Sequence, residues 1–448
     1  MLYKIKKPNL SKINYGKVFE NILKQDAKKI QEIIKLTQET FQPMYLYWDK
    51  IKYKQLPKGI SPEEFWVSVK FTRKNLAIKS EIKSENGKYF TWIRLLGTEE
   101  FFHKIDLNTG GSFFTIKENV DEKNKQKLIF RGVMEEAIAS SQLEGASTTR
   151  KVAKQFLREG RKPKNESEQM ILNNYQTMQI IESDYKNKEM NLSLIFELHK
   201  MITKNTIPEN EQGKFRKDTD NIVVSDKKYS NIIYHQPPKI AFVKNEFENF
   251  VKFANDQLDE PFIHPVLKAI MLHFWIGYLH PFTDGNGRLA RLIFYWYLLK
   301  KDYWAFSYLP ISKAIKKSPI QYGNAYVYSE QDDFDLTYFI DYNIRKIKLA
   351  ISDFEEYLER KSKENLRMNK LARTKYNLNE RQIQLLQYLY GDRNEKTALN
   401  VHMNIYQVTK MTAIKDLKNL EKLGFIISEK QGRNIYYYAT DKIGKLFR

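Results

Sequence analysis

The residues whose types and spacing indicate chemistry lie together in the stretch HPFTDGNGRLAR, residues 280–291. Gly285 and Gly287 can adopt positive φ, so successive backbone N–H groups can converge into an anion-binding nest. The helical pattern that follows places this nest at a helix N-terminus, where unpaired donors and the helix dipole attract phosphate. The stretch therefore predicts a binding site for a phosphorylated ligand.

Four charged or titratable side chains accompany the predicted nest. Arg288 and Arg291 lie three positions apart, which puts them on one helix face as a clamp for further phosphate oxygens. Asp284 can hold a hard cation such as Mg2+ that bridges the phosphates. His280 can, as a neutral imidazole, remove a proton from an attacking hydroxyl. A plain turn with solvated arginines would not need all of these residues, so we expect nucleotide phosphoryl or nucleotidyl transfer.

The chain that positions this motif divides into three segments by its pattern of apolar residues. Residues 1–112 form a mixed α/β region of unknown role, in which Ser61 and Pro62 mark a helix start. Residues 113–371 show long helical patterns with one strand-like interruption at 221–238, which predicts a β-hairpin on a helical body. We therefore expect a mainly α fold with a mixed N-terminal region.

The third segment, residues 376–448, follows a charged helical bridge and has its own pattern. Three short helical stretches precede FIISEKQGRNIYYYAT, which predicts a hairpin. Thr409 is a candidate N-cap and Gly424 a candidate stop for the third helix. This order resembles a winged helix-turn-helix module, which would serve DNA binding or, equally, dimerisation or target docking. The candidate DNA-binding residues are Lys410, Thr412, Lys415, Lys430 and Arg433.

Composition narrows the class of protein further. The 448 residues include 75 Lys and Arg against 54 Asp and Glu, a net charge of +21, which either favours polyanionic partners or reflects coding bias. The chain has no cysteine, which excludes disulfides, zinc–thiolate sites and thiol catalysis. The N-terminus lacks the apolar stretch of a signal peptide, and the longest apolar run, 292–299, is far shorter than a membrane span. We expect a soluble, cytoplasmic protein that does not contact a membrane.

HPFTDGNGRLAR resembles the signature of Fic proteins, H-x-F-x-(D/E)-G-N-G-R-x-x-R, at every defined position. The apolar helix pattern before it, GKFRK at residues 213–217 and the predicted hairpin also resemble that family. The resemblance extends from about residue 135 to residue 299. It implies a helical Fic-type core with a hairpin flap. It also implies transfer of AMP from ATP, with Mg2+, to a Tyr, Thr or Ser hydroxyl of a target protein.

The resemblance also implies a role for each residue of the motif. His280 would be the general base, Asp284 the magnesium ligand, and Phe282 the anchor that holds the loop in the core. The remaining motif residues would hold phosphates, and the flap would bind the target segment by strand addition. The phosphate-binding residues would be Gly285, Asn286, Gly287, Arg288 and Arg291. The flap residues would be Val223, Val224, Ile233 and Tyr234.

A second motif, SSQLEGAS at residues 140–147, lies in a helical pattern upstream. Ser140 and Glu144 are one helical turn apart, and Gly145 allows close packing. Taken alone, such a glutamate is a solvated charge. The stretch nevertheless resembles the inhibitory motif of the family, (S/T)-x-x-x-E-(G/N), in a helix near 135–147. The resemblance implies that Glu144 pairs with Arg291 in the place of the ATP γ-phosphate and so misplaces the α-phosphate.

The sequence thus predicts a protein adenylyltransferase that Glu144 inhibits. One alternative is removal of AMP by the same site. Another is a DNA-binding transcriptional regulator whose Fic-like domain only senses nucleotide; the intact His280 argues against it, since a sensor needs no base beside the phosphates. The sequence also leaves open whether the protein forms a homodimer.

Overall fold

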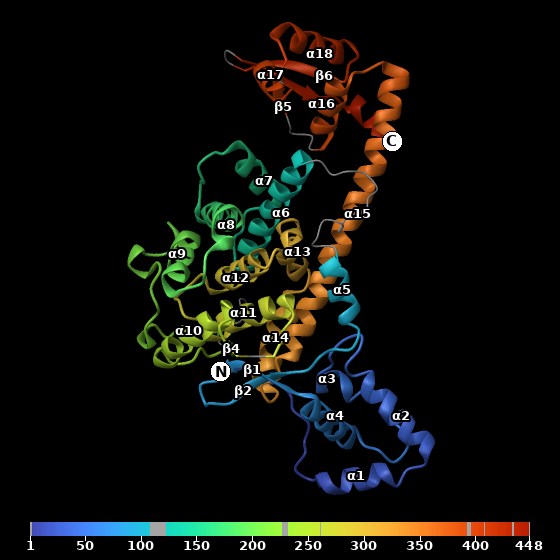
Figure 1. Ribbon diagram of the computed structural model, residues 1–448, viewed down its shortest axis with the longest axis vertical. Helices are drawn as coiled ribbons and strands as arrows, with labels where there is room; N and C mark the ends of the chain where they lie inside the picture. The colour runs from blue at the N-terminus through green and yellow to red at the C-terminus, as the bar shows by residue number, and fades with distance from the viewer. Residues whose placement is uncertain are drawn as a thin grey trace. The chain divides into compact units, whose positions relative to one another are not determined.

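The chain divides into two compact units, residues 1–351 and 352–448 (Figure 1). Helices dominate both units and the sheets are small, so the expected mainly α fold is confirmed. The division falls within the long helix α15 (Thr337–Tyr376), whereas the sequence pattern places it after residue 371. The computed structural model describes residues 2–107, 122–225, 232–259, 261–391, 396–406, 408–431 and 434–447.

The N-terminal part of the first unit is a mixed region, as its sequence predicts. Ser61 caps the helix that follows it: its side chain accepts from the N–H of Glu64, and the Glu64 side chain accepts from the N–H of Ser61. Trp48 and Trp66 are buried in a core that Tyr338 of α15 also joins. The elements are α1 (Tyr15–Leu23), α2 (Ala27–Gln38), α3 (Trp48–Ile51), α4 (Pro62–Leu76), the antiparallel strands β1 (Ile78–Lys83) and β2 (Tyr89–Trp92), and α5 (Glu99–Leu107).

Two helices with apolar residues on all sides form the centre of the first unit. These are α11 (Pro265–Leu279) and α12 (Asn286–Lys300), which lie side by side and are joined by the HPFTDG loop (Figure 1). A helix that is apolar all round must be enclosed by other elements. Four helices pack directly on this pair: α6 (Glu122–Leu143), α8 (Glu166–Ser183), α9 (Leu192–Thr203) and α10 (Ile240–Ala254). The other helices around them are α7 (Arg150–Glu159), α13 (Ile311–Lys316) and α14 (Pro319–Gln331).

The hairpin that the sequence places at 221–238 consists of β3 (Val224–Ser225) and β4 (Ile233–His235), which pair antiparallel. The other edge of β4 is also occupied. Leu2 bridges Ile233 in parallel, and the Tyr3 N–H donates to the Ile233 carbonyl over 2.7 Å. Residues from the start of the chain therefore cover one edge of the flap.

The second unit contains a three-stranded antiparallel sheet in the order β5–β7–β6 and its own helices. Thr409 caps α18 by accepting from the Thr412 N–H, and Gly424 follows the end of α18 with a φ of 74°. The predicted hairpin is present, and β5 is an additional strand that pairs with β7. The winged-helix assignment itself stays a prediction. The elements are α16 (Glu380–Gly391), β5 (Lys396–Ala398), α17 (Leu399–Tyr406), α18 (Lys410–Lys422), β6 (Ile426–Gln431), β7 (Asn434–Ala439) and α19 (Gly444–Phe447).

Among the helices that the structure describes, none combines the length and the apolar character needed to span a bilayer.

Candidate active site

His280 ends α11 in a conformation that few residues with a side chain adopt. Its φ is 44° and its ψ is 57°, in the left-handed region, so it costs backbone energy that the surrounding contacts must offset. Arg216 supplies two of those contacts. The Arg216 Nε donates to the His280 carbonyl over 2.8 Å, and the Arg216 N–H donates to the Pro281 carbonyl over 2.9 Å. Arg216, from GKFRK, therefore fixes the turn that presents His280.

The His280 ring is set up to accept a proton. Its Nδ1 lies 3.3 Å from the Gly277 carbonyl, which can only accept a hydrogen bond, so the hydrogen belongs on Nδ1. The Nε2 is then the unprotonated nitrogen. Burial, followed by the charge of nearby His235, lowers the pKa of His280 to about 4. The ring is therefore neutral at physiological pH, as a general base must be.

Asn286 and Phe282 close the loop on itself. The Asn286 Oδ1 accepts from the Phe282 N–H over 3.0 Å, and the Asn286 Nδ2 donates to the Phe282 carbonyl over 2.9 Å. The Phe282 ring is fully buried, as predicted for the anchor. Since the amide of Asn286 is used within the loop, only its backbone N–H is left for a phosphate.

His199 of α9 packs against the loop and binds its backbone, a role that the sequence did not predict. Its ring stacks on Phe282 with centroids 3.7 Å apart. Its Nε2 donates to the Asp284 carbonyl over 2.9 Å, and its Nδ1 accepts from the Gly213 N–H over 2.9 Å. Burial lowers the pKa of His199 to about 4, so this histidine is neutral as well. A histidine in an amphipathic helix gives no sequence signal for such a role.

Gly285 adopts the positive φ that the sequence predicts, at the N-terminus of α12, whereas Gly287 lies inside the helix and does not. Gly285 has a φ of 81°, and a Cβ there would lie 2.8 Å from Thr203 Cγ2. The N–H groups of the first helical turn have no carbonyl partner within the helix. A Cβ on Gly287 would collide with Oε1 of Glu144. The Glu144 carboxylate therefore lies directly against the nest.

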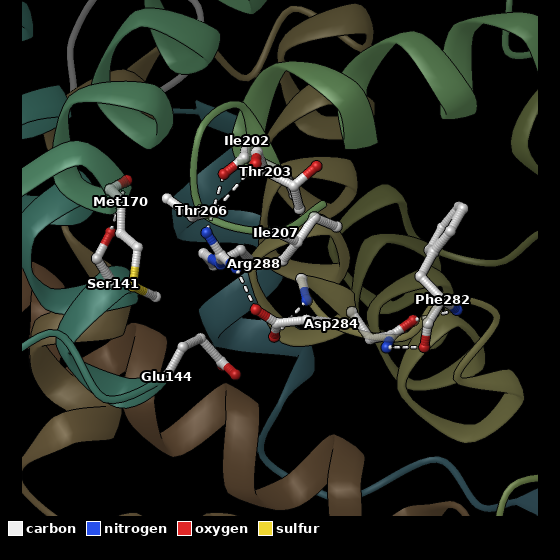
Figure 2. Close-up of polar contacts among 12 residues, drawn as sticks. Ser141, Glu144, Met170, Ile202, Thr203, Thr206, Ile207, Phe282, Asp284 and Arg288 are labelled. Carbon is white, nitrogen blue, oxygen red and sulfur yellow. Dashed lines mark hydrogen bonds and ion pairs between the residues drawn. The ribbon is translucent and has the colours of Figure 1, made fainter. Parts of the chain in front are cut away.

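The spacing of Arg288 and Arg291 predicts a joint clamp for phosphate, but in the structure the two side chains bind different partners. Arg288 is fully buried, and it donates to the Ile202 carbonyl over 2.9 Å and to Asp284 Oδ2 over 3.0 Å (Figure 2). The Ile202 carbonyl belongs to the last turn of α9, where carbonyls lack helical partners and attract a cation. Of the side-chain nitrogens of Arg288, Nε is buried and meets no hydrogen-bond partner among the described residues.

Arg291 instead faces the end of α6. Its Nε donates to Ser140 Oγ over 2.8 Å, and its Nη2 donates to the Ser140 carbonyl over 3.0 Å and to Glu144 Oε1 over 2.8 Å. Burial alone would lower the pKa of Arg291, but the Glu144 carboxylate raises it overall. Its Nη1 is buried and meets no hydrogen-bond partner among the described residues. Arg291 thus keeps one donor for a further anion.

Glu144 lies one residue beyond the end of α6, in a turn rather than in the helix. Its side chain extends toward the region of Asp284 and Arg288 (Figure 2). Gly145 has a φ of 114°, and no described atom lies within 4 Å of the position of a Cβ. The expectation that Gly145 serves close packing is therefore wrong. Glycine is needed because other residues rarely adopt this backbone conformation.

Asp284 fits a cation that a phosphorylated ligand brings with it. Its side chain is half exposed, and Oδ1 accepts from the Gly285 N–H over 2.6 Å. The described residues include no cluster of three or more His, Asp and Glu side chains that would hold a metal by themselves. Mg2+ commonly binds one or two carboxylates plus substrate phosphates. The unpaired Nη1 of Arg291 and the N–H groups at the start of α12 suit those phosphates, so the residues present fit Mg2+ with ATP.

The remaining predicted residues lie on the flap and in the second unit. Val223, Val224, Ile233 and Tyr234 are half-buried on and beside β3 and β4. Lys410, Thr412 and Lys415 lie on α18 and Lys430 on β6, while Arg433 lies outside the described residues. The structure thus brings the two motifs together, and the candidate DNA-binding residues belong to a separate unit.

Comparisons with known proteins agree with the motif. The model of the Fic/DOC family matches residues 189–298. The protein adenylyltransferase Fic of Nematostella vectensis is 32% identical over 111 residues, which cover 24% of this chain and 22% of the relative. The enzyme of the same name from Aedes aegypti is 31% identical over 121 residues, covering 26% and 21%. The match therefore spans about a fifth of the length of these relatives.

Two solved structures are similar to the chain over a longer range. A Fic family protein from Desulfovibrio desulfuricans is 16% identical, with a TM-score of 0.47, over 78% of this chain and 97% of that one. Fic-1 from C. elegans is 14% identical, with a TM-score of 0.48, over 77% and 88%.

Proposed function

We propose that this chain, which carries a Fic domain, transfers AMP from ATP to a Tyr, Thr or Ser hydroxyl of a target protein and is held inactive by Glu144. The observation that carries the proposal is the position of the Glu144 carboxylate. It lies against the nest at Gly287 and binds Arg291, which are two groups suited to phosphate.

The proposed reaction uses His280 as the base. The acceptor hydroxyl gives its proton to Nε2 of His280, and its oxygen forms a bond to the α-phosphorus of ATP. The bond between that phosphorus and the bridging oxygen breaks, and pyrophosphate leaves. Mg2+, held by Asp284, would supply charge neutralisation of the phosphates. The backbone N–H groups of the nest and the open Nη1 of Arg291 orient the nucleotide.

The proposed inhibition follows from the same contacts. While Glu144 is paired with Nη2 of Arg291, a γ-phosphate that would bind the arginine lies next to the carboxylate instead. Two negative groups repel each other, so the triphosphate must shift, and its α-phosphate moves away from His280. Removal of the carboxylate frees the arginine for the phosphate.

Target binding would use the flap. One edge of β4 is already covered by Leu2 and Tyr3. In the described residues β3 has no second strand neighbour, so its outer edge is open to an extended target segment. We therefore place the target beside Val223 and Val224.

The test is AMP incorporation from α-labelled ATP with Mg2+, in wild type, Glu144→Gly and Glu144→Gly/His280→Ala. Self-labelling should rise strongly in the single variant and fall by roughly 10² to 10⁴ in the double variant. Glu189→Gly, which changes an exposed loop residue, is the matched control and should leave labelling as in wild type. If Glu144→Gly changes neither ATP affinity nor labelling, the proposed inhibition is wrong. ATP binding without labelling in any variant would favour the sensor alternative.

A further inference from the structure

His235, the last residue of β4, has an acceptor at each ring nitrogen. Its Nδ1 lies 2.7 Å from Oε2 of Glu330, and its Nε2 lies 2.8 Å from the carbonyl of Tyr278. A carboxylate and a carbonyl only accept hydrogen bonds, whereas a neutral imidazole has a single N–H. Both nitrogens of His235 therefore carry a hydrogen, and the ring is an imidazolium paired with Glu330.

This pair joins three elements around the proposed base. His235 belongs to the flap, Glu330 to α14, and Tyr278 to the last turn of α11. The Tyr278 carbonyl is among the last four of its helix, which lack helical partners and favour a cation. Because His280 follows α11 directly, the His235 ring ties the flap to the segment that presents the base.

The charged groups near His235 and His280 come from several elements. Glu330 of α14 and Arg216 of the loop before the flap face His235. His235, Arg216 and Glu144 face His280, and the centroids of the two imidazole rings are 6.3 Å apart. Burial alone would lower the pKa of His235, but Glu330 raises it overall. The resulting positive charge acts with burial to lower the pKa of His280 to about 4.

We infer that His235 and Glu330 are a positioning pair, which fixes the flap against the end of α11 and holds a positive charge beside His280 that opposes its protonation. The inference rests on the transfer reaction proposed above. It assigns the pair no contact with the reacting atoms. Its effect is exerted through the orientation and the charge state of His280.

The decisive variants are Glu330→Gln and His235→Asn, each made in the Glu144→Gly protein. His280 acts as a base only when unprotonated, so labelling falls as the pH drops through its pKa. Loss of the neighbouring positive charge should raise that pKa, and the acid limb of the rate profile should move to higher pH by about one unit. Glu330→Asp keeps the carboxylate and should restore the original profile.

The matched control is His103→Asn in the Glu144→Gly protein, since His103 is exposed on α5. A uniform loss of labelling at every pH, without a shift of the acid limb, would overturn the inference because it would indicate a merely structural role.

A second measurement does not need activity. The ring protons of the 7 histidines can be titrated by NMR, and the resonance of His280 is assigned from His280→Ala. The pKa of His280 should be higher in Glu330→Gln than in the parent. An unchanged pKa of His280 would contradict the inference even if none of the variants incorporated AMP. If the Glu144→Gly protein incorporated no AMP, that result would count against the proposed function and not against the positioning role of His235 and Glu330.

Discussion

At the scale of single residues, the loop between α11 and α12 divides its side chains between two tasks. Asn286 and Phe282 bind and anchor the loop itself. His280, Asp284 and Arg291 keep groups that can meet a ligand. A motif read along the sequence shows that all of these residues belong together. It does not show which of these side chains form hydrogen bonds within the protein, because those bonds depend on the folded positions of their partners.

The contact between Glu144 and Gly287 can be tested by a double-mutant cycle. Gly287→Ala puts a Cβ into Oε1 of Glu144, so it should destabilise the wild type more than the Glu144→Gly protein. We expect a coupling energy of about 0.5–3 kcal/mol from urea unfolding of the four proteins. Gly323→Ala on α14 is the control, since no described atom lies within 4 Å of its Cβ position. Additive effects of Gly287→Ala and Glu144→Gly would place Glu144 away from the nest.

Residues contributed by distant parts of the chain have roles that the sequence did not predict. Arg216 binds the carbonyl of His280, and His199 binds the carbonyl of Asp284. Both contact backbone atoms, so their partners could not be predicted, although Arg216 belongs to GKFRK, a stretch that resembles the family. Arg288 illustrates the reverse case: its spacing from Arg291 was visible, but its direction was set by the Ile202 carbonyl at the end of α9.

At the scale of elements, local signals were the most informative. Ser61 and Thr409 could be recognised as helix starts because each side-chain oxygen accepts a hydrogen bond from the N–H three residues later in the sequence. The pairing of Leu2 with Ile233 has no such local signal. Strand pairing over so long a separation is fixed only by the packing of the whole unit.

The covering of the flap edge depends on Gln331 at the end of α14. Its Oε1 accepts from the Ile5 N–H over 3.0 Å, and its Nε2 donates to the Tyr3 carbonyl over 2.8 Å. Gln331→Leu removes both hydrogen bonds, so exchange of the amide hydrogens of residues 3–5 should become about tenfold faster. Hydrogen–deuterium exchange measures this, with exposed Gln38→Leu as the control. Unchanged exchange would mean that β4 alone holds the segment.

At the scale of the whole molecule, each unit has its own core. The core of the second unit includes Leu386, Leu417 and Phe425, all fully buried. The boundary between the units falls inside α15, and a continuous helical pattern cannot reveal such a point. Net charge was equally uninformative about DNA binding, since Lys and Arg are spread over the entire chain.

Separate cores predict separate responses to a core mutation. Leu417→Ala should destabilise the second unit by about 2–5 kcal/mol. In calorimetry one thermal transition should then fall while the other keeps its midpoint, and labelling by the Glu144→Gly protein should be retained. Met411→Ala, at an exposed position of the same helix, is the control and should move neither transition. A joint shift of both transitions would show that the units unfold together.

The order of Glu144 and Arg291 along the chain has a consequence for the newly made protein. The ion pair joins positions 147 residues apart, with the glutamate first. A ribosome synthesises a chain from its N-terminus, so α6 and the turn after it emerge well before α12. The nest and its arginine are therefore completed in the presence of the carboxylate. On the proposed function, each new molecule has Glu144 beside its nucleotide site from the start, and activity requires a later event that moves the carboxylate.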